Sequence, residues 1–148
     1  METRFAKVSD FDFLVEGLES IRLAEKKPKD KIKANASDKR ELSFAIKNKL
    51  VRILEINSTP AAFIYFRKNF QRTLLKEKFL WVDLIYTRPS FRKKGLAQKL
   101  YSEIFQMAKR KKYPKIVIDI YEPNINSKKF HKKIGFRPLY TIYEKIFI

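Results

Sequence analysis

The stretch FRKKGLAQKL, residues 91–100, places a glycine between a cluster of cations and the expected start of a helix. Backbone N–H groups in the first turn of a helix have no partner within it, and the helix dipole adds roughly half a positive charge there. A glycine at this point lets an anion approach the backbone closely. The stretch therefore predicts a cradle for a phosphate or pyrophosphate, and a loop glycine among solvated lysines is the alternative. The residues concerned are Arg92, Lys93, Lys94, Gly95, Leu96 and Ala97.

Two carboxylates interrupt stretches that are otherwise apolar: Asp83 in WVDLIY and Asp119 in VIDIY. A carboxylate on a mostly buried strand is costly unless it has a partner or a catalytic task. Both are therefore candidates for a general base, and Glu55 in VRILEI is a weaker third candidate. A salt-bridged or solvent-facing strand position is the alternative for each, because the chain is rich in lysine.

His131 is the only histidine, and the chain has no cysteine. The lack of cysteine excludes disulfides, cysteine metal ligands and a cysteinyl acyl-enzyme. One histidine and scattered carboxylates offer no cluster of metal ligands, so we expect no metal. A histidine pKa near 6.5 makes His131 a candidate proton donor near neutral pH.

These residues need elements to hold them, and the hydrophobic periodicity predicts a single domain over residues 1–148. The expected strands are residues 3–8, 51–56, 61–68, 74–87, 115–121 and 137–148. The expected helices are residues 11–25, 38–49, 95–112 and 127–134, with a charged loop over 26–37. The resulting order, β-α-α-β-β-β-α-β-α-β, is typical of an α/β or α+β domain with a mixed sheet.

Within this order, two motifs resemble those of the GNAT acetyltransferase superfamily, and the resemblance covers nearly the whole chain. The family's cofactor motif, Arg/Gln-x-x-Gly-x-Gly/Ala, matches RKKGLA at 92–97, and LIYTRPSF before it resembles the end of the family's fourth strand. The segment IVIDIYEPNINSKKFHKKIGF, residues 116–136, resembles the family's strand, asparagine, short helix and Gly-Phe. The resemblance implies the GNAT fold, in which the fourth and fifth strands splay apart at a bulge.

The resemblance also implies that acetyl-CoA binds and that its acetyl group passes directly to a primary amine in a ternary complex. The pyrophosphate would lie on the amides of residues 92–97, and the pantetheine would pair with the backbone of residues 85–87. Asn124 and the short helix would flank the far arm of the cofactor. The implied cofactor-binding residues outside the 92–97 motif are Ile85, Tyr86, Thr87, Asn124, Ser127, Phe130 and Lys133.

Three chemical tasks follow from such a transfer: deprotonating the amine, stabilising the oxyanion and releasing the thiolate. Asp119 resembles in position the glutamate base of ribosomal-protein N-terminal acetyltransferases. A backbone N–H near the strand-four bulge, around Tyr86 or Thr87, is the natural oxyanion donor.

The family commonly has a tyrosine five residues before the phenylalanine of the Gly-Phe pair, and His131 stands there in this chain. Three interpretations stay open. His131 donates the proton, or hydrogen-bonds the thioester sulfur without proton transfer, or is a bystander on a basic helix. Three tyrosines elsewhere could also supply the proton: Tyr121, Tyr140 and Tyr143.

The formal net charge is +18, from 34 lysines and arginines against 16 aspartates and glutamates. Such a charge attracts phosphorylated cofactors and nucleic acid, or it coats a solvated surface. A basic RNA- or ribosome-associated module is one alternative function, but a stacking platform needs more interleaved aromatics than the basic segments contain. We therefore expect nucleic-acid binding to be weak and nonspecific. A CoA-binding regulatory module without turnover is the other alternative.

The amine acceptor cannot be named from these motifs. A cationic protein attracts polyamines or lysine-rich tails poorly unless a local acidic pocket overrides the mean field. Glu16, Glu19 and Glu25 are candidates for such a pocket. No segment resembles a signal peptide or approaches the roughly 18 apolar residues of a membrane helix, so a soluble cytoplasmic protein without membrane contact is expected. A homodimer stays open.

Overall fold

The structure, a computed structural model, describes residues 1–68 and 76–147, and in these the strands form one sheet in the order β1-β2-β3-β4-β5. Neighbours from β1 to β4 are antiparallel, whereas β5 is parallel to β4 because α4 lies between them in the chain. The strands are β1 (Glu2–Phe5), β2 (Val51–Ile56), β3 (Thr59–Lys68), β4 (Phe79–Thr87) and β5 (Lys115–Ile118). The helices are α1 (Phe11–Ala24), α2 (Lys29–Ile32), α3 (Ala36–Lys47), α4 (Leu96–Arg110) and α5 (Ile125–Lys133), with 3-10 turns η1 (Val8–Asp10) and η3 (Pro89–Phe91).

Local signals explain why the central elements form where they do. Asn57 and Ser58 join β2 to β3 with φ values of 50° and 62°, and a two-residue hairpin turn of this kind needs both in the left-handed region. Asn35 caps α3 by accepting a hydrogen bond from the Asp38 N–H, and the Asp38 carboxylate accepts the Asn35 N–H in return. These local pairs mark the turn between β2 and β3 and the start of α3.

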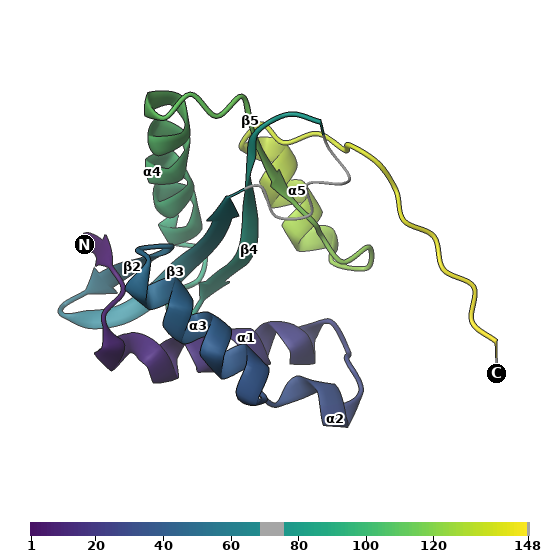
Figure 1. Ribbon diagram of the computed structural model, residues 1–148, viewed down its shortest axis with the longest axis horizontal. Helices are drawn as coiled ribbons and strands as arrows, with labels where there is room; N and C mark the ends of the chain where they lie inside the picture. The colour runs from purple at the N-terminus through teal and green to yellow at the C-terminus, as the bar shows by residue number, and fades with distance from the viewer. Residues whose placement is uncertain (69–75, 148) are drawn as a thin grey trace.

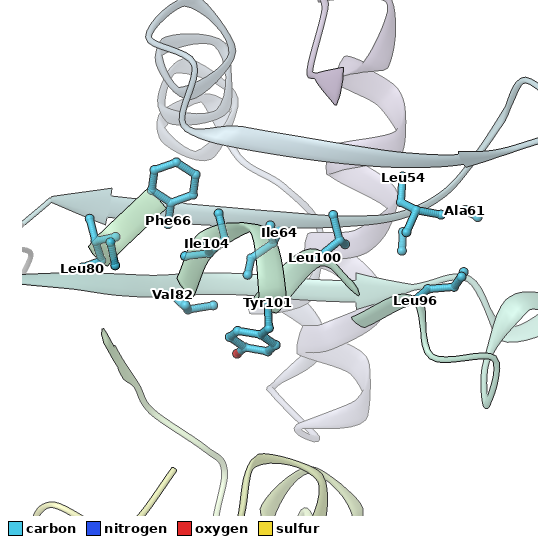
Figure 2. Packing of buried hydrophobic residues seen from close by; sticks show 12 residues of the cluster. Leu54, Ala61, Ile64, Phe66, Leu80, Val82, Leu96, Leu100, Tyr101 and Ile104 are labelled. Atoms are coloured by element: carbon cyan, nitrogen blue, oxygen red, sulfur yellow. The ribbon is translucent and has the colours of Figure 1, made fainter. Parts of the chain in front are cut away.

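The two faces of the sheet carry separate apolar layers, with α1 and α3 on one side and α4 on the other (Figure 1). Leu100 and Ile104 of α4 lie against Ile64 of β3 and Val82 of β4 (Figure 2). Burying each such side chain contributes about 1.5–3 kcal/mol. The other layer joins the helices α1 and α3 to β2, β3 and β4 through Leu14, Leu42, Ala45, Ile53, Phe63 and Tyr86.

β4 departs from regular pairing at two points that matter for the site. Its register against β3 shifts where Tyr65 pairs with Leu84 and Phe66 with Val82, so that Asp83 is the extra residue of a bulge. Its pairing with β5 ends at Val82 and Ile118, and beyond that pair the two strands separate. The expected splay of the fourth and fifth strands is therefore confirmed. The sequence analysis expected the bulge around Tyr86 or Thr87, but it lies upstream of them, at Asp83.

The sequence prediction is wrong at the end of the chain. A strand was expected over 137–148, but residues 137–147 form no strand and run extended away from the body (Figure 1). A strand needs a neighbour for its backbone N–H and C=O groups, and no strand among residues 1–68 and 76–147 pairs with this segment. Hydrophobic periodicity shows which residues favour a strand, but it does not show whether another strand lies alongside to pair with them.

Smaller differences have similar causes. β5 ends at Ile118 instead of residue 121, because the chain turns away from β4 at that point. The loop expected over 26–37 contains α2, a short helix that begins directly after Pro28. The first part of the strand expected from residue 74 lies outside the described residues. In the part of the chain that the structure covers, every helix is too short or too polar to span a bilayer.

Candidate active site

The turn that leads into α4 has the geometry of an anion cradle. Gly95 is the N-cap residue of α4 with φ +78°, a left-handed conformation that favours glycine. Lys93 is also left-handed, at φ +62°, which costs about 1–3 kcal/mol and is typical of functional loops. Residues 92–95 are exposed, and α4 has no acidic residue in its first turn. The first N–H groups of α4 are therefore reachable, and no neighbouring carboxylate in that turn offsets their charge.

The end of β4 offers an open backbone edge beside this turn. Arg88 N–H donates to the Ala61 carbonyl of β3 at 2.9 Å, so alternation along the extended backbone turns the Thr87 and Ile85 N–H groups toward the opposite edge. Among the described residues no strand pairs with that edge beyond Val82. An extended chain of amides could add to it as a strand does. Arg92 Nε donates to the Thr87 carbonyl at 3.0 Å and ties the cradle to this edge.

The side chains of the same segment point into the two apolar layers. Ile85 packs against the layer with α4, and Tyr86 belongs to the layer with α1 and α3. The Tyr86 hydroxyl donates to Glu16 at 2.9 Å. Ile85 and Thr87 thus present backbone groups to the open edge, whereas Tyr86, also expected there as a backbone partner or oxyanion donor, pairs with Phe63 of β3.

The two strand carboxylates come together where β4 and β5 separate. Burial raises the pKa of Asp83, Arg67 at 3.3 Å opposes that rise, and the charge of Asp119 adds to it. Partial desolvation also raises the pKa of Asp119, which follows β5 at the surface, and the nearby charge of Lys27 opposes the rise. Both carboxyl groups therefore bind a proton more readily than an aspartate in water.

His131 lies between α5 and α4 and is 2% exposed. Its Nε2 is 2.8 Å from the Tyr101 hydroxyl, and its Nδ1 is 2.8 Å from the Ser127 carbonyl. Both contacts are satisfied when Nδ1 carries the proton and Nε2 accepts from Tyr101. Burial lowers the pKa of His131, and the hydrogen bond to Ser127 opposes that change only in part. The ring is therefore neutral at pH 7 and has no free nitrogen to offer a substrate.

The other residues expected around α5 differ in their surroundings. Asn124 caps the helix by accepting the Ser127 N–H at 3.0 Å. Phe130 packs against Tyr101, and Lys133 is exposed in the last turn. Glu55 does not reach this region, because it pairs with Arg4 between β1 and β2 at the opposite edge of the sheet.

Comparison with known proteins identifies the family of a chain with this turn, this open edge and these splayed strands. Residues 16–136 match the model of the family described as "Acetyltransferase (GNAT) family". The chain belongs to the GNAT family. Its members transfer acyl groups and use acetyl-CoA, so this GNAT chain is an acyltransferase.

Solved GNAT structures have the same fold at low sequence identity. A mutant of the BH1408 protein from Bacillus halodurans has a TM-score of 0.84 at 18% identity, with 100% of both chains covered. A ribosomal-protein-alanine N-acetyltransferase from Brucella melitensis biovar Abortus 2308 has a TM-score of 0.68 at 15% identity, covering 99% of this chain and 100% of that one. An aminoglycoside N-acetyltransferase in complex with CoA has a TM-score of 0.75 at 14% identity, covering 98% and 93%. No curated protein matches the chain significantly.

A pocket of about 210 Å³ adjoins Asp83 on the face of the sheet that carries α1 and α3. Arg67 pairs there with Glu41 and with Asp83, and the two Arg22–Asp38 contacts are 2.9 Å each. Sequence analysis missed Arg67, Glu41, Arg22 and Asp38. Their pairing joins elements far apart in the chain, and only the alternation of β3, which puts Tyr65 and Arg67 on one face, could have indicated part of it.

The three acidic residues expected on the first helix have different partners, and Glu25 follows the end of α1. Glu16 binds Arg88 and Tyr86, and Arg88 lowers the pKa of Glu16. Glu19 accepts the Ala34 N–H at 2.7 Å. Burial raises the pKa of Glu25, the charge of Lys27 at 3.8 Å opposes that rise, and the charge of Asp119 adds to it.

Proposed function

We propose that this GNAT chain is an N-acetyltransferase that moves an acetyl group from acetyl-CoA to a primary amine by direct attack in a ternary complex. One observation carries the proposal: the left-handed Gly95 turn and the open edge of β4 are joined through the hydrogen bond between Arg92 and Thr87. The turn suits a pyrophosphate, and the edge suits the amides of a pantetheine arm. Acetyl-CoA would supply an acyl group activated as a thioester.

Asp119 is our candidate for the general base. It lies at the surface where β4 and β5 separate, and partial desolvation raises its pKa, as catalysis near neutral pH requires. Asp83 is the alternative base, although its ion pair with Arg67 stabilises the charged carboxylate and so opposes proton uptake. The N–H groups of Thr87 and Ile85 on the open edge are our candidates for the oxyanion donor. Because a thiol has a pKa near 8.5, CoA can leave as a thiolate, and the transfer does not require a dedicated general acid.

A primary amine is the acceptor that the local charges favour. The carboxylates of Asp83, Asp119 and Glu25 influence one another inside a protein whose formal net charge is +18. A protonated amine is attracted to such a group of carboxylates even within a cationic field. Two solved neighbours are named as N-acetyltransferases, one of a ribosomal-protein alanine and one of an aminoglycoside. The acceptor is a small molecule or a protein or peptide amine.

A CoA-binding module without turnover is the second candidate, because the buried, neutral His131 stands where the family commonly has a tyrosine. Thiol release from acetyl-CoA, measured with and without a panel of amines and peptide N-termini, separates the two functions. Release that depends on an amine supports the transferase. A thermal shift with acetyl-CoA and no release across the panel supports the binding module.

Gly95→Ala tests the cradle itself. The new side chain meets no atom within 4 Å but is strained at φ +78°, so we expect weaker acetyl-CoA binding, by about tenfold, from a displaced turn. Gly135→Ala is the matched control, because Gly135 is also left-handed, at φ +105°, and also faces open space, but after α5. Equal loss of the acetyl-CoA thermal shift in both variants would contradict the cradle.

A further inference from the structure

The turn that ends α1 holds one lysine in a defined backbone position. Lys26 is left-handed, at φ 55°, and its N–H donates to the Leu23 carbonyl at 3.1 Å. The Lys27 N–H donates to the Arg22 carbonyl, also at 3.1 Å, and these two hydrogen bonds form a Schellman motif. Although Lys27 begins a charged loop, the turn therefore fixes the point from which its side chain leaves the backbone.

This turn lies beside the candidate catalytic carboxylates. Arg22, in the last turn of α1, lines the same pocket as Asp83 of β4. The Lys27 ammonium is 3.8 Å from the Glu25 carboxylate, and its charge also acts on Asp119. In Figure 1 the chain that follows β5 runs toward the end of α1 that carries this turn. The fold thus places an amine of the chain itself beside the candidate general base.

Lys27 has the properties that an acetyl acceptor needs. Its side chain is 50% exposed, so a thioester can reach the nitrogen, and its flexible four-carbon stem lets the nitrogen move toward that thioester. A primary ammonium becomes a nucleophile only after it loses a proton, and Asp119 would accept that proton. An ion pair that only stabilises the turn is the alternative.

We propose that Lys27 is a modification site, acetylated by the active site of its own chain. This rests on the proposed function, because acetyl-CoA on the open edge of β4 would bring its thioester to the point where β4 and β5 separate. The Lys27 ammonium gives one proton to Asp119, and Nζ then bonds to the thioester carbonyl carbon. The C–S bond breaks with its electron pair on sulfur, which takes a further proton from the nitrogen. The products are acetylated Lys27 and CoA, and Asp119 returns its proton to water.

Incubation of the purified full chain with acetyl-CoA, without an added amine, gives the first test. Cleavage after Glu25 and Glu41 releases residues 26–41, and fragmentation of this peptide assigns each acetyl group to one lysine. The exposed neighbour Lys26 reports the spontaneous rate. We expect Lys27 to be acetylated at least about tenfold faster than Lys26, because a general base contributes roughly 10²–10⁴-fold. Equal rates at the two lysines would overturn the proposal.

Two further measurements separate the active site from spontaneous chemistry and from transfer between copies. Free CoA competes for the cofactor site, so an excess of it should slow acetylation of Lys27 and leave the rate at Lys26 unchanged. A Lys27 rate that free CoA does not change would refute catalysis by the site. A reaction within one chain keeps its fractional rate when the protein is diluted. A rate that rises in proportion to protein concentration would contradict acetylation within the chain.

Lys27→Arg links the modification to turnover, because a guanidinium keeps the charge but stays protonated. Thiol release from acetyl-CoA without an added amine should fall to background, and the acetyl-CoA thermal shift checks that the cofactor still binds. Lys26→Arg is the matched control and should release thiol as the natural chain does. Thiol release that persists in Lys27→Arg would overturn the proposal. Release with an external amine but no acetylation of Lys27 would overturn this inference alone, whereas no release with any amine would overturn the proposed function as well.

Discussion

At the scale of single residues, burial shifts the pKa of two candidate site groups in opposite directions. It raises the pKa of Asp119 and lowers the pKa of His131, because the charged form is disfavoured in both. A raised aspartate pKa means that the folded state binds the proton more tightly, so stability falls as pH rises from about 3.9 through the raised value. A lowered histidine pKa has the other sign, and stability is lost as pH falls below about 6.5.

Asp119→Asn should therefore separate activity from stability. If Asp119 is the base, kcat/KM near neutral pH falls by about 10²–10⁴-fold and recovers in part as pH rises, because the amine then loses its proton unaided. The urea midpoint at pH 7 should be unchanged or higher, since a partly desolvated charge has been removed. Glu122→Gln, at an exposed carboxylate three residues further on, is the control. Full activity of Asp119→Asn at every pH would rule out the base.

His131→Ala should lower stability more than turnover. It leaves the buried Tyr101 hydroxyl without its 2.8 Å partner, which costs about 1–3 kcal/mol in addition to the packing lost. Adding Tyr101→Phe removes the unpaired hydroxyl and should recover part of that loss. Urea unfolding and steady-state kinetics check both variants. A kcat that falls more than the KM for acetyl-CoA rises, with stability kept, would instead make His131 the proton donor.

At the scale of elements, agreement between sequence and structure depends on where each signal lies in the chain. The hairpin of β2 and β3, and the stripe of α4, follow from neighbouring residues, and the Gly95 turn was found from its own motif. Three features depend instead on which strand lies alongside: the length of β5, the position of the bulge at Asp83 and the conformation of residues 137–147. The Arg67 network also escaped prediction, because its members are joined only by the fold.

The packing of α1 on the sheet can be tested at Gly17. A Cβ there would lie 2.5 Å from Phe63 Cζ, so in Gly17→Ala either the buried Phe63 ring or α1 itself must shift. We expect a loss of about 1–3 kcal/mol from overpacking, larger than the helix propensity gained, about 1 kcal/mol. Chemical denaturation measures it, with Leu23→Ala at an exposed position of the same helix as the control. A Gly17→Ala variant as stable as the natural chain would show that α1 packs loosely enough on the sheet to accommodate the added methyl group.

At the scale of the whole molecule, two charge distributions coexist. The formal net charge of +18 favours the approach of a phosphorylated cofactor from any direction. The carboxylates of Asp83, Asp119 and Glu25 influence one another near the point where β4 and β5 separate, with Arg67 and Lys27 as their nearby cations. Binding of the cofactor should therefore weaken with added salt.

The short pairing between β4 and β5 also has a consequence for local opening. Among the described residues only four pairs, from Phe79–Lys115 to Val82–Ile118, join β5 to the sheet, whereas β3 pairs with β4 over most of its length. Strands held by few hydrogen bonds exchange their amide hydrogens through sub-global openings that cost less than complete unfolding. Hydrogen exchange of the free protein should thus be faster in β5 than in β3. A ligand bound between the splayed strands would slow exchange in β5 far more than in β3, and equal protection of both strands would show that the sheet opens as one unit.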